Sequence, residues 1–221
     1  MKQQMHLAFD LSYTHLDGRW RVPGSWTGRL YPDVGIYEEV ARIAERGCVD
    51  MIFFGDGTGI PSTWRGSEEE AVRWGIQWPR HDVSPWIPLM ARATSHVGFC
   101  LTYASTFMHP FYTARLLNSL DHVTNGRIAF NVITSTRRAD AANYGFDELM
   151  EHDLRYERME EFIEMSARLC GAASRRTPSC GIANPASWPT PAKCAPSTIP
   201  GGSSRCVARL TWCRRRRAGR C

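Results

Sequence analysis

Asp56, Thr102, Asn131 and Ser135 are side chains whose types and positions suit ligand binding, since each lies in or after a strand-like apolar run. Hydroxyl and amide groups of this kind can hold a phosphate or the polar edge of a planar cofactor. The same groups can instead bond the local backbone, and Asp56 can serve simply as a turn residue. The chemistry to expect from these four residues is therefore recognition through hydrogen bonds.

His152 and Tyr156 form a second candidate group at the start of a predicted helix. They are four residues apart, so they share one helix face. The free N–H groups and the dipole of a helix N-terminus favour anions, so the pair suits a phosphate. A surface histidine beside a half-buried tyrosine fits the same spacing equally well. The remaining histidines lack the helical spacing of metal ligands, and no metal site is expected.

Strand and helix patterns alternate from residue 6 to residue 169, and they must position these candidates. Apolar runs predict strands at residues 6–11, 49–54, 97–103 and 128–133. Helical periodicity and capping signals predict helices at residues 35–46, 110–124 and 153–169, with a short helix opening at Ser84-Pro85. On the first helix, the inward positions expected are Ile36, Val40, Ile43 and Ala44.

This alternation indicates an α/β fold with a parallel sheet of about four strand–helix units. The sheet is either doubly wound or the first half of a (β/α)8 barrel, and the pattern alone does not choose between them. In both architectures ligands bind at the carboxyl ends of the strands, where Asp56, Thr102, Asn131 and Ser135 fall. Gly55-Asp56-Gly57-Thr58-Gly59 is not a dinucleotide fingerprint, because Pro61 blocks an early helix and the third glycine is misplaced.

The composition changes abruptly near residue 170. Residues 170–221 contain ten Lys and Arg, no Asp or Glu, and six of the eight cysteines. Residues 1–169 contain the other 17 basic residues and all 22 acidic ones, so the two parts carry net charges of +10 and −5. We expect a folded part, residues 1–169, and a disordered basic tail, residues 170–221, translated out of frame.

The composition of the tail has two other interpretations. The four arginines at 214–217 could form a nucleic-acid patch, and the six cysteines could form a disulfide or zinc framework. The cysteines lack a paired C-x2-C spacing, which disfavours zinc, and no aromatic residues interleave the arginines as in RNA-binding surfaces. We therefore expect no nucleic-acid partner.

Several classes of protein are disfavoured by the rest of the chain. No run of 18 or more apolar residues exists, so no membrane span is expected, and residues 1–7 lack a signal peptide's apolar stretch. Cys48 and Cys100 stand in apolar surroundings and are expected to be buried thiols, which favours a reducing cytoplasm.

Residues 5–169 resemble the bacterial luciferase-like, reduced-flavin-dependent monooxygenases, and most closely the branch of nitrilotriacetate, dibenzothiophene-sulfone and pristinamycin-type enzymes. The resemblance rests on short stretches that occur in the family's order. They are residues 41–47 (ARIAERG), 50–57 (DMIFFGDG), 119–127 (SLDHVTNGR), 131–135 (NVITS), 142–145 (ANYG) and 155–158 (RYER).

The resemblance implies a TIM barrel that uses FMNH2 supplied by a separate NAD(P)H-dependent flavin reductase. Oxygen would add to the flavin C4a, and the resulting hydroperoxide would oxygenate a small organic substrate, often with C–N or C–S cleavage. By resemblance, Asp56, Thr102, His152 and Tyr156 fall on FMN-contacting positions, with Asn131 and Ser135 as weaker candidates. The family also implies a homo-oligomer. A deazaflavin-dependent oxidoreductase of the same superfold is the alternative enzyme.

The sequence departs from the family after residue 169, where strands five to eight would follow. Shifted by one reading frame, the codons permitted for residues 203–212 can spell a family-like segment, FKVRGPLNV. This favours the interpretation of the chain as the N-terminal half of such an enzyme, inactive by itself. We expect weak or no FMN binding by a half-barrel.

Overall fold

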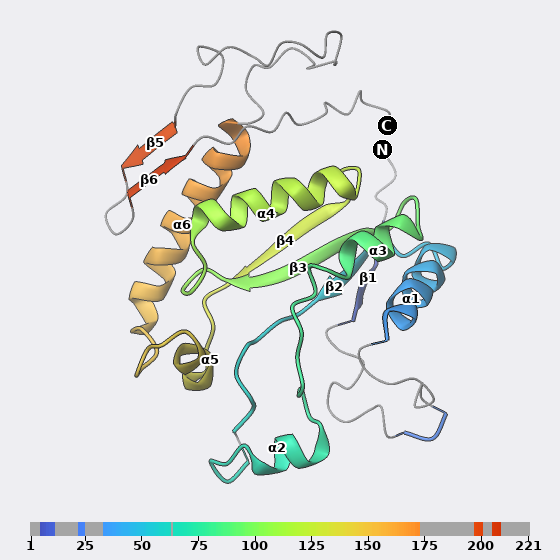
Figure 1. Ribbon diagram of the computed structural model, residues 1–221, viewed down its shortest axis with the longest axis horizontal. Coiled ribbons are helices and arrows are strands. Elements are labelled where there is room, and N and C mark those ends of the chain that lie inside the picture. Colours follow the sequence, from blue (N-terminus) through green and yellow to red (C-terminus); the bar gives the residue numbers. More distant parts are fainter. Residues whose placement is uncertain are drawn as a thin grey trace.

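A four-stranded parallel sheet organises the protein. The structure, a computed structural model, describes residues 5–11, 22–24, 33–62, 64–172, 197–200 and 205–208. The strands β1 (Ala8–Asp10), β2 (Met51–Phe54), β3 (Gly98–Ala104) and β4 (Ile128–Ile133) are hydrogen-bonded in the order β1-β2-β3-β4 (Figure 1). This sequential order is how a barrel winds, and it confirms the predicted α/β class with four parallel strands.

The helices cover one face of this sheet. They are α1 (Val34–Arg46), α3 (Ile87–Arg92), α4 (Pro110–Val123) and α6 (His152–Ala172). The apolar faces of α1, α3 and α4 and the helix-facing strand residues form one core, in which Ile52, Phe99 and Leu101 are fully buried, and Met165 and Leu169 of α6 form a second cluster with Ala114 of α4. α6 joins this layer because Phe162 lies against Phe130 of β4, with ring centroids 6.4 Å apart. A doubly wound sheet would carry helices on both faces, so the barrel alternative is the one observed.

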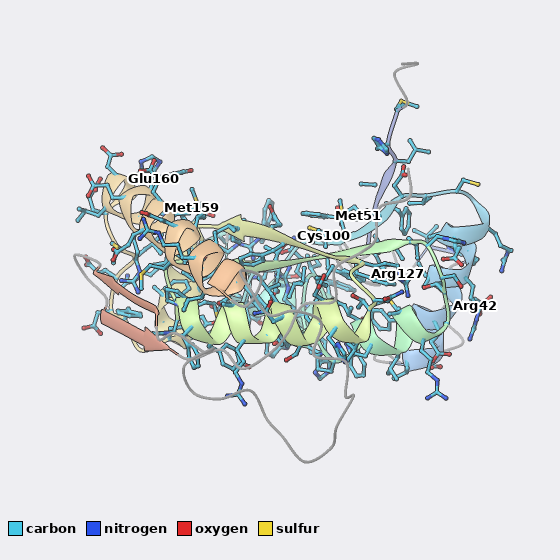
Figure 2. The ribbon with its side chains drawn as sticks, turned by 90° about the horizontal axis from the view of Figure 1, so that it is seen from above. Arg42, Met51, Cys100, Arg127, Met159 and Glu160 are labelled. Carbon is cyan, nitrogen blue, oxygen red and sulfur yellow. The ribbon has the colours of Figure 1, made fainter. Side chains whose placement is uncertain are left out.

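The opposite face of the sheet carries the alternate residues of each strand. Phe53, Cys100 and Ala129 are partners across β2, β3 and β4, and Thr102 and Asn131 are partners further along β3 and β4. In Figure 2, Met51 and Cys100 lie on the side of the sheet away from α4. In a barrel this is the interior face, where rows of side chains from neighbouring strands stack in layers.

Local sequence signals set the helix boundaries. Asp33 caps α1 by accepting a hydrogen bond from the Gly35 N–H at 2.7 Å, and His109 caps α4, where Pro110 follows in the first turn. The predicted helices at 35–46 and 110–124 are confirmed to within a residue or two, and α6 runs three residues beyond its predicted end.

Two short helices were not predicted. α2 (Glu69–Trp74) lies on a long excursion between β2 and α3, and α5 (Arg138–Asn143) follows β4 (Figure 1). Each has six residues, too few for a clear amphipathic period, so sequence periodicity could not reveal them.

Ile43 and Cys48 were predicted to be buried, and both predictions were wrong. Ile43 is 46% exposed, because α1 turns Ile36, Tyr37, Ala41 and Ala44 inward instead. Cys48 is exposed, since it lies in the turn after α1 with a left-handed backbone (φ 54°) that carries it out of the helical face. Cys100 is buried, as predicted, and burial raises the pKa of its thiol.

The described part of residues 170–221 comprises three stretches. Residues 170–172 complete α6, while β5 (Ser197–Pro200) and β6 (Arg205–Ala208) pair antiparallel as a separate two-stranded sheet near α6 (Figure 1). These eight strand residues differ from the predicted disorder, and their β-branched Thr198, Ile199 and Val207 favour extended backbone. The rest of the predicted tail, including residues 214–217, lies outside the described residues.

The amino end of the sheet is closed by two charged side chains. The Arg127 guanidinium donates to the carbonyls of Ala91, Thr94, Val97 and Thr124 at 2.6–3.1 Å and to the Thr94 hydroxyl at 2.9 Å. These bonds tie the end of α3 and the end of α4 to the start of β3. In Figure 2, Arg127 lies among these elements, whereas Arg42 projects outward from α1.

Glu45 also joins elements at the amino end of the sheet, as a hydrogen-bond acceptor. Its carboxylate accepts hydrogen bonds from the backbone N–H groups of Ser95, His96 and Val97 at 2.8–3.1 Å, joining α1 to the turn before β3. Burial alone would raise the pKa of Glu45, but these three N–H donors outweigh it and lower the pKa.

Candidate functional site

A pocket opens at the carboxyl ends of β2, β3 and β4. It holds about 270 Å³ of space, open solvent included, so it is a shallow, open pocket. Three of the six predicted site residues, Asp56, Thr102 and Ser135, lie in its wall. The full lining is Asp56, Gly57, Thr58, Thr102, Tyr103, Ala104, Phe107, Ile133, Ser135 and Tyr144.

Thr102 and Asn131 are hydrogen-bonded to each other on the interior face of the sheet. They are register partners on β3 and β4, and the Asn131 amide donates to the Thr102 hydroxyl at 3.0 Å. Thr102 is 2% exposed, so its hydroxyl is fixed by its strand and by this bond. Asn131 is therefore attached to the pocket through Thr102, although it is not itself part of the lining.

Ser135 ends β4 in an unusual conformation. Its φ is 63°, a left-handed geometry that serine adopts at some energetic cost. Its hydroxyl donates to Asp140, and its carbonyl accepts a hydrogen bond from Arg155 of α6. The strained residue is thus held by bonds from two elements, a situation that recurs at functional sites.

Asp56 stands in the loop that follows β2. Its carboxylate accepts the Gly57 N–H at 2.7 Å and lies 3.7 Å from the Arg80 guanidinium. Arg80 is itself engaged, since it donates to the Gly57 carbonyl and to the backbone and side-chain oxygens of Gln77. Both side chains of the ion pair are largely buried, at 11% and 16% exposure. Asp56 is therefore built into the pocket wall and is more than a turn aspartate.

An aromatic pair forms the opposite wall. The rings of Phe107 and Tyr144 stack with centroids 4.5 Å apart and an interplanar angle of 7°. Burial, followed by the nearby charges of Asp56, Asp82 and Asp140, raises the pKa of Tyr144, so its phenol stays protonated.

Tyr103 is a second protonated phenol at the pocket. Burial raises its pKa well above the usual range, and its hydroxyl donates to both Asp82 oxygens at 2.8 and 3.0 Å. Asp82, on the excursion before α3, therefore orients the end of β3.

The structure places His152 and Tyr156 on the exposed first turns of α6, apart from the pocket lining. The two rings lie 5.0 Å apart, and His152 Nδ1 is 2.7 Å from Asp153. The Glu151 carboxylate accepts the Asp153 and Leu154 N–H groups at 2.9 and 3.0 Å, and these bonds lower the Glu151 pKa. A phosphate at this helix end would have to compete with that carboxylate.

Sequence reasoning about strand ends missed Phe107, Tyr144 and Asp140. Phe107 and Tyr144 lie in loops whose positions no strand period sets, and Asp140 lies on the unpredicted helix α5. A signal existed for Tyr144, because the stretch at residues 142–145 carries part of the family resemblance.

The arrangement can hold a flat, partly polar molecule. Apolar and aromatic groups supply surface, while the Thr102 hydroxyl and the exposed side of Asp56 supply hydrogen bonds. Within the described residues there is no group of three or more His, Cys, Asp or Glu side chains suited to a metal ion. No helix in the same described part has the length and apolar character needed to cross a membrane.

Comparison with known proteins places this chain in a family. A family model described as luciferase-like monooxygenase matches residues 22–214. The dimethyl-sulfide monooxygenase of Hyphomicrobium sulfonivorans is 41% identical over 172 residues, 76% of this chain and 36% of that protein. The nitrilotriacetate monooxygenase component A of Aminobacter aminovorans is 38% identical over 175 residues, 76% of this chain and 38% of that protein.

A solved structure agrees in fold. The long-chain alkane monooxygenase structure superposes with a TM-score of 0.71 at 35% identity, covering 76% of this chain and 39% of that one. The present chain spans less than two fifths of the length of the curated relatives described here.

Proposed function

Because the chain belongs to the luciferase-like monooxygenase family, we propose that the pocket at the carboxyl ends of β2, β3 and β4 is part of an FMN site. The activity proposed for the whole protein is FMNH2- and O2-dependent oxygenation of a small organic substrate. One observation carries this proposal: three strand ends and an aromatic pair converge on a single pocket.

The residues present fit a flavin. A flavin ring is flat and apolar over its faces with polar atoms along its edge, and the pocket joins the Phe107–Tyr144 stack to the Thr102 hydroxyl. The Asn131 amide donates a hydrogen bond to the Thr102 hydroxyl, and Ser135 lines the pocket at the end of β4. We assign ring recognition to Asp56 and Thr102, with Asn131 and Ser135 in support. His152 and Tyr156, three residues before and one residue after Arg155, are proposed for the phosphate, which would displace the Glu151 carboxylate from the Asp153 and Leu154 N–H groups.

The chain's own contribution is binding, orientation and exclusion of water. Bound reduced flavin would supply the two electrons that activate O2. Burial and nearby carboxylates raise the pKa values of Tyr103 and Tyr144, so both phenols keep their protons: Tyr103 donates to Asp82, and Tyr144 is a neutral donor at the pocket. The apolar wall of Ala104, Phe107 and Ile133 excludes water from this side of the site.

The substrate and the partner follow from the relatives. One relative is named for dimethyl sulfide and another for nitrilotriacetate, so C–S or C–N cleavage is the proposed outcome. The name "component A" implies a second component, for which we propose an NAD(P)H-dependent flavin reductase. We also propose that the enzyme is a cytoplasmic homo-oligomer.

The division of the chain near residue 170 is likewise a proposal. Its support is the change from a net charge of −5 to +10 and the gathering of six cysteines after residue 169. Resequencing the gene around this codon and reading the next frame downstream tests it: family-like sequence in the shifted frame is expected, and its absence would overturn the proposal.

The flavin site is tested by FMN titration of the full chain and of Tyr144→Ala. The pocket supplies one wall only, so we expect weak binding, on the order of 0.1 mM. Losing the stacked ring should weaken it about three- to tenfold. Tyr112→Ala is the matched control, because Tyr112 is 54% exposed on the outer helix α4. Equal losses in the two variants would contradict the proposed site.

A further inference from the structure

The loop after β2, residues 55–61, is bound to α5 by contacts that span about 80 residues of sequence. The Gly59 N–H donates to Asp140 at 2.5 Å, and the Thr58 hydroxyl lies 3.3 Å from the same oxygen. The Asn143 amide donates to the Thr58 carbonyl at 2.6 Å, and Arg137 donates to the Gly59 carbonyl at 3.3 Å. The Gly59 N–H and the carbonyls of Thr58 and Gly59 are thereby satisfied from α5 and the residue before it.

Asp140 is the centre of these contacts. It is 3% exposed, and its second oxygen accepts the hydroxyl of Ser135. A buried carboxylate is costly to desolvate unless hydrogen bonds compensate it, and here the donors come from the β2 loop and from the end of β4. Asp140 therefore joins two parts of the pocket wall, the segment with Thr58 and the strained Ser135.

The backbone of the loop also touches α5 directly. A Cβ placed on Gly59 would lie 2.7 Å from the Cβ of Ala139 and 2.7 Å from the nitrogen of Asp140. Real Cβ atoms do not approach so closely, so only glycine allows this contact. The loop is consequently held against α5 at Gly59.

The contact between Gly59 and α5 fixes the position of the neighbouring Asp56. We call the bonds from Arg137, Asp140 and Asn143 to Thr58 and Gly59 the clamp. Asp56 and Gly57 directly precede Thr58, and Arg80 contacts both of them. Gln77 then links the two arginines, because its side-chain oxygen accepts from Arg80 at 3.0 Å and from Arg137 at 3.1 Å. The clamp and the Asp56 ion pair are thus parts of one connected network.

We propose that Asp140 is a positioning residue: it holds the β2 loop so that Asp56 presents its carboxylate to the pocket ligand. Asp140 acts through Gly59 and Asp56, and it is not itself part of the pocket lining. The ligand in this statement rests on the proposed function, since it is taken to be FMN. The clamp itself is independent of the ligand and can be measured without it.

The first measurement is amide hydrogen exchange in the full chain. The Gly59 N–H should be protected in the wild type, and Asp140→Ala should remove that protection at residues 57–59 while β3 stays protected. Asp140→Asn should restore it, because an amide oxygen can accept from Gly59. Asp147→Ala, an exposed aspartate nearby in sequence, is the control and should change nothing. Unchanged protection of Gly59 in Asp140→Ala would overturn the proposal.

The second measurement is FMN affinity in a double-mutant cycle. Asp140→Ala should weaken FMN binding at least fivefold in the wild-type background and clearly less in Asp56→Ala, because most of its effect passes through Asp56 and only the remainder through its bond to Ser135. Independent, additive losses would refute the positioning role. A purely structural role would not produce this coupling or its rescue by Asp140→Asn.

Two outcomes are kept apart by this design. If the wild type binds no FMN, the proposed function fails, while exchange at Gly59 still decides whether the clamp exists. If Asp140→Ala does not fold, Asn143→Ala replaces it, because Asn143 is exposed and its amide donates to the Thr58 carbonyl. Faster exchange of the loop in that variant is expected, and wild-type exchange would count against the clamp.

Discussion

The two ends of the parallel sheet use their polar side chains in opposite ways. At the amino end, Arg127 and Glu45 are saturated with backbone partners and join α1, α3 and α4 to β3. At the carboxyl end, Asp56, Thr102 and Ser135 each keep a side toward a pocket. In barrels the carboxyl end carries chemistry and the amino end carries stability, and the hydrogen bonding of the described residues is what such a division would require.

The strongest test of this division is Arg127→Met. It removes the hydrogen-bond donors to four carbonyls and one hydroxyl, and it should lower the free energy of unfolding by about 3 kcal/mol. Chemical denaturation measures this. Arg42→Met is the matched control: its ion pair with Glu38 is a solvent-exposed i,i+4 contact worth at most about 0.5 kcal/mol. Equal effects would show that the amino end is not the stabilising one.

Thr102→Val probes the carboxyl end with a smaller effect on stability. The hydroxyl lost is the acceptor of the Asn131 amide, so we expect a destabilisation of about 1–2 kcal/mol and weaker FMN binding. Thr113→Val is the control, because the Thr113 hydroxyl is buried in α4 with no hydrogen-bond partner among the described residues. That variant should keep its FMN affinity and lose no stability. The comparison fails if both threonines affect FMN equally.

Glu45 gives the smallest expected effect, and it depends on pH. Its folded-state pKa lies below the ordinary value of 4.5, so its stabilisation is present above that pH and lost as the pH falls through the folded value. Melting temperatures of wild type and Glu45→Gln should therefore differ slightly at pH 7 and converge below pH 4. Glu148→Gln, an exposed control, should track the wild type throughout. A gap that widens in acid would contradict the role given to Glu45.

The sequence predicted the repeating elements and the residues that they carry. Strand patterns placed Asp56, Thr102 and Ser135 at the carboxyl ends, and parallel pairing then brought them into one wall. Parallel pairing needs no knowledge of loops, which is why this part of the site was predictable.

The remainder of the site depends on long-range contacts. Tyr144 reaches Phe107 across 37 positions, and Asp140 reaches Gly59 across 81, through a helix too short to show a period. The choice between a barrel and a doubly wound sheet was also open, because it depends on which face the helices cover. Chain winding decides that, and local pattern does not.

Chemical-shift mapping of the full chain with FMN tests the central claim most directly. The account predicts saturable shifts gathered at the backbone of Gly57, Thr102 and Tyr144, with the amide signals around Arg127 and Glu45 unmoved. Shifts at the amino end of the sheet, or none at millimolar FMN, would contradict it.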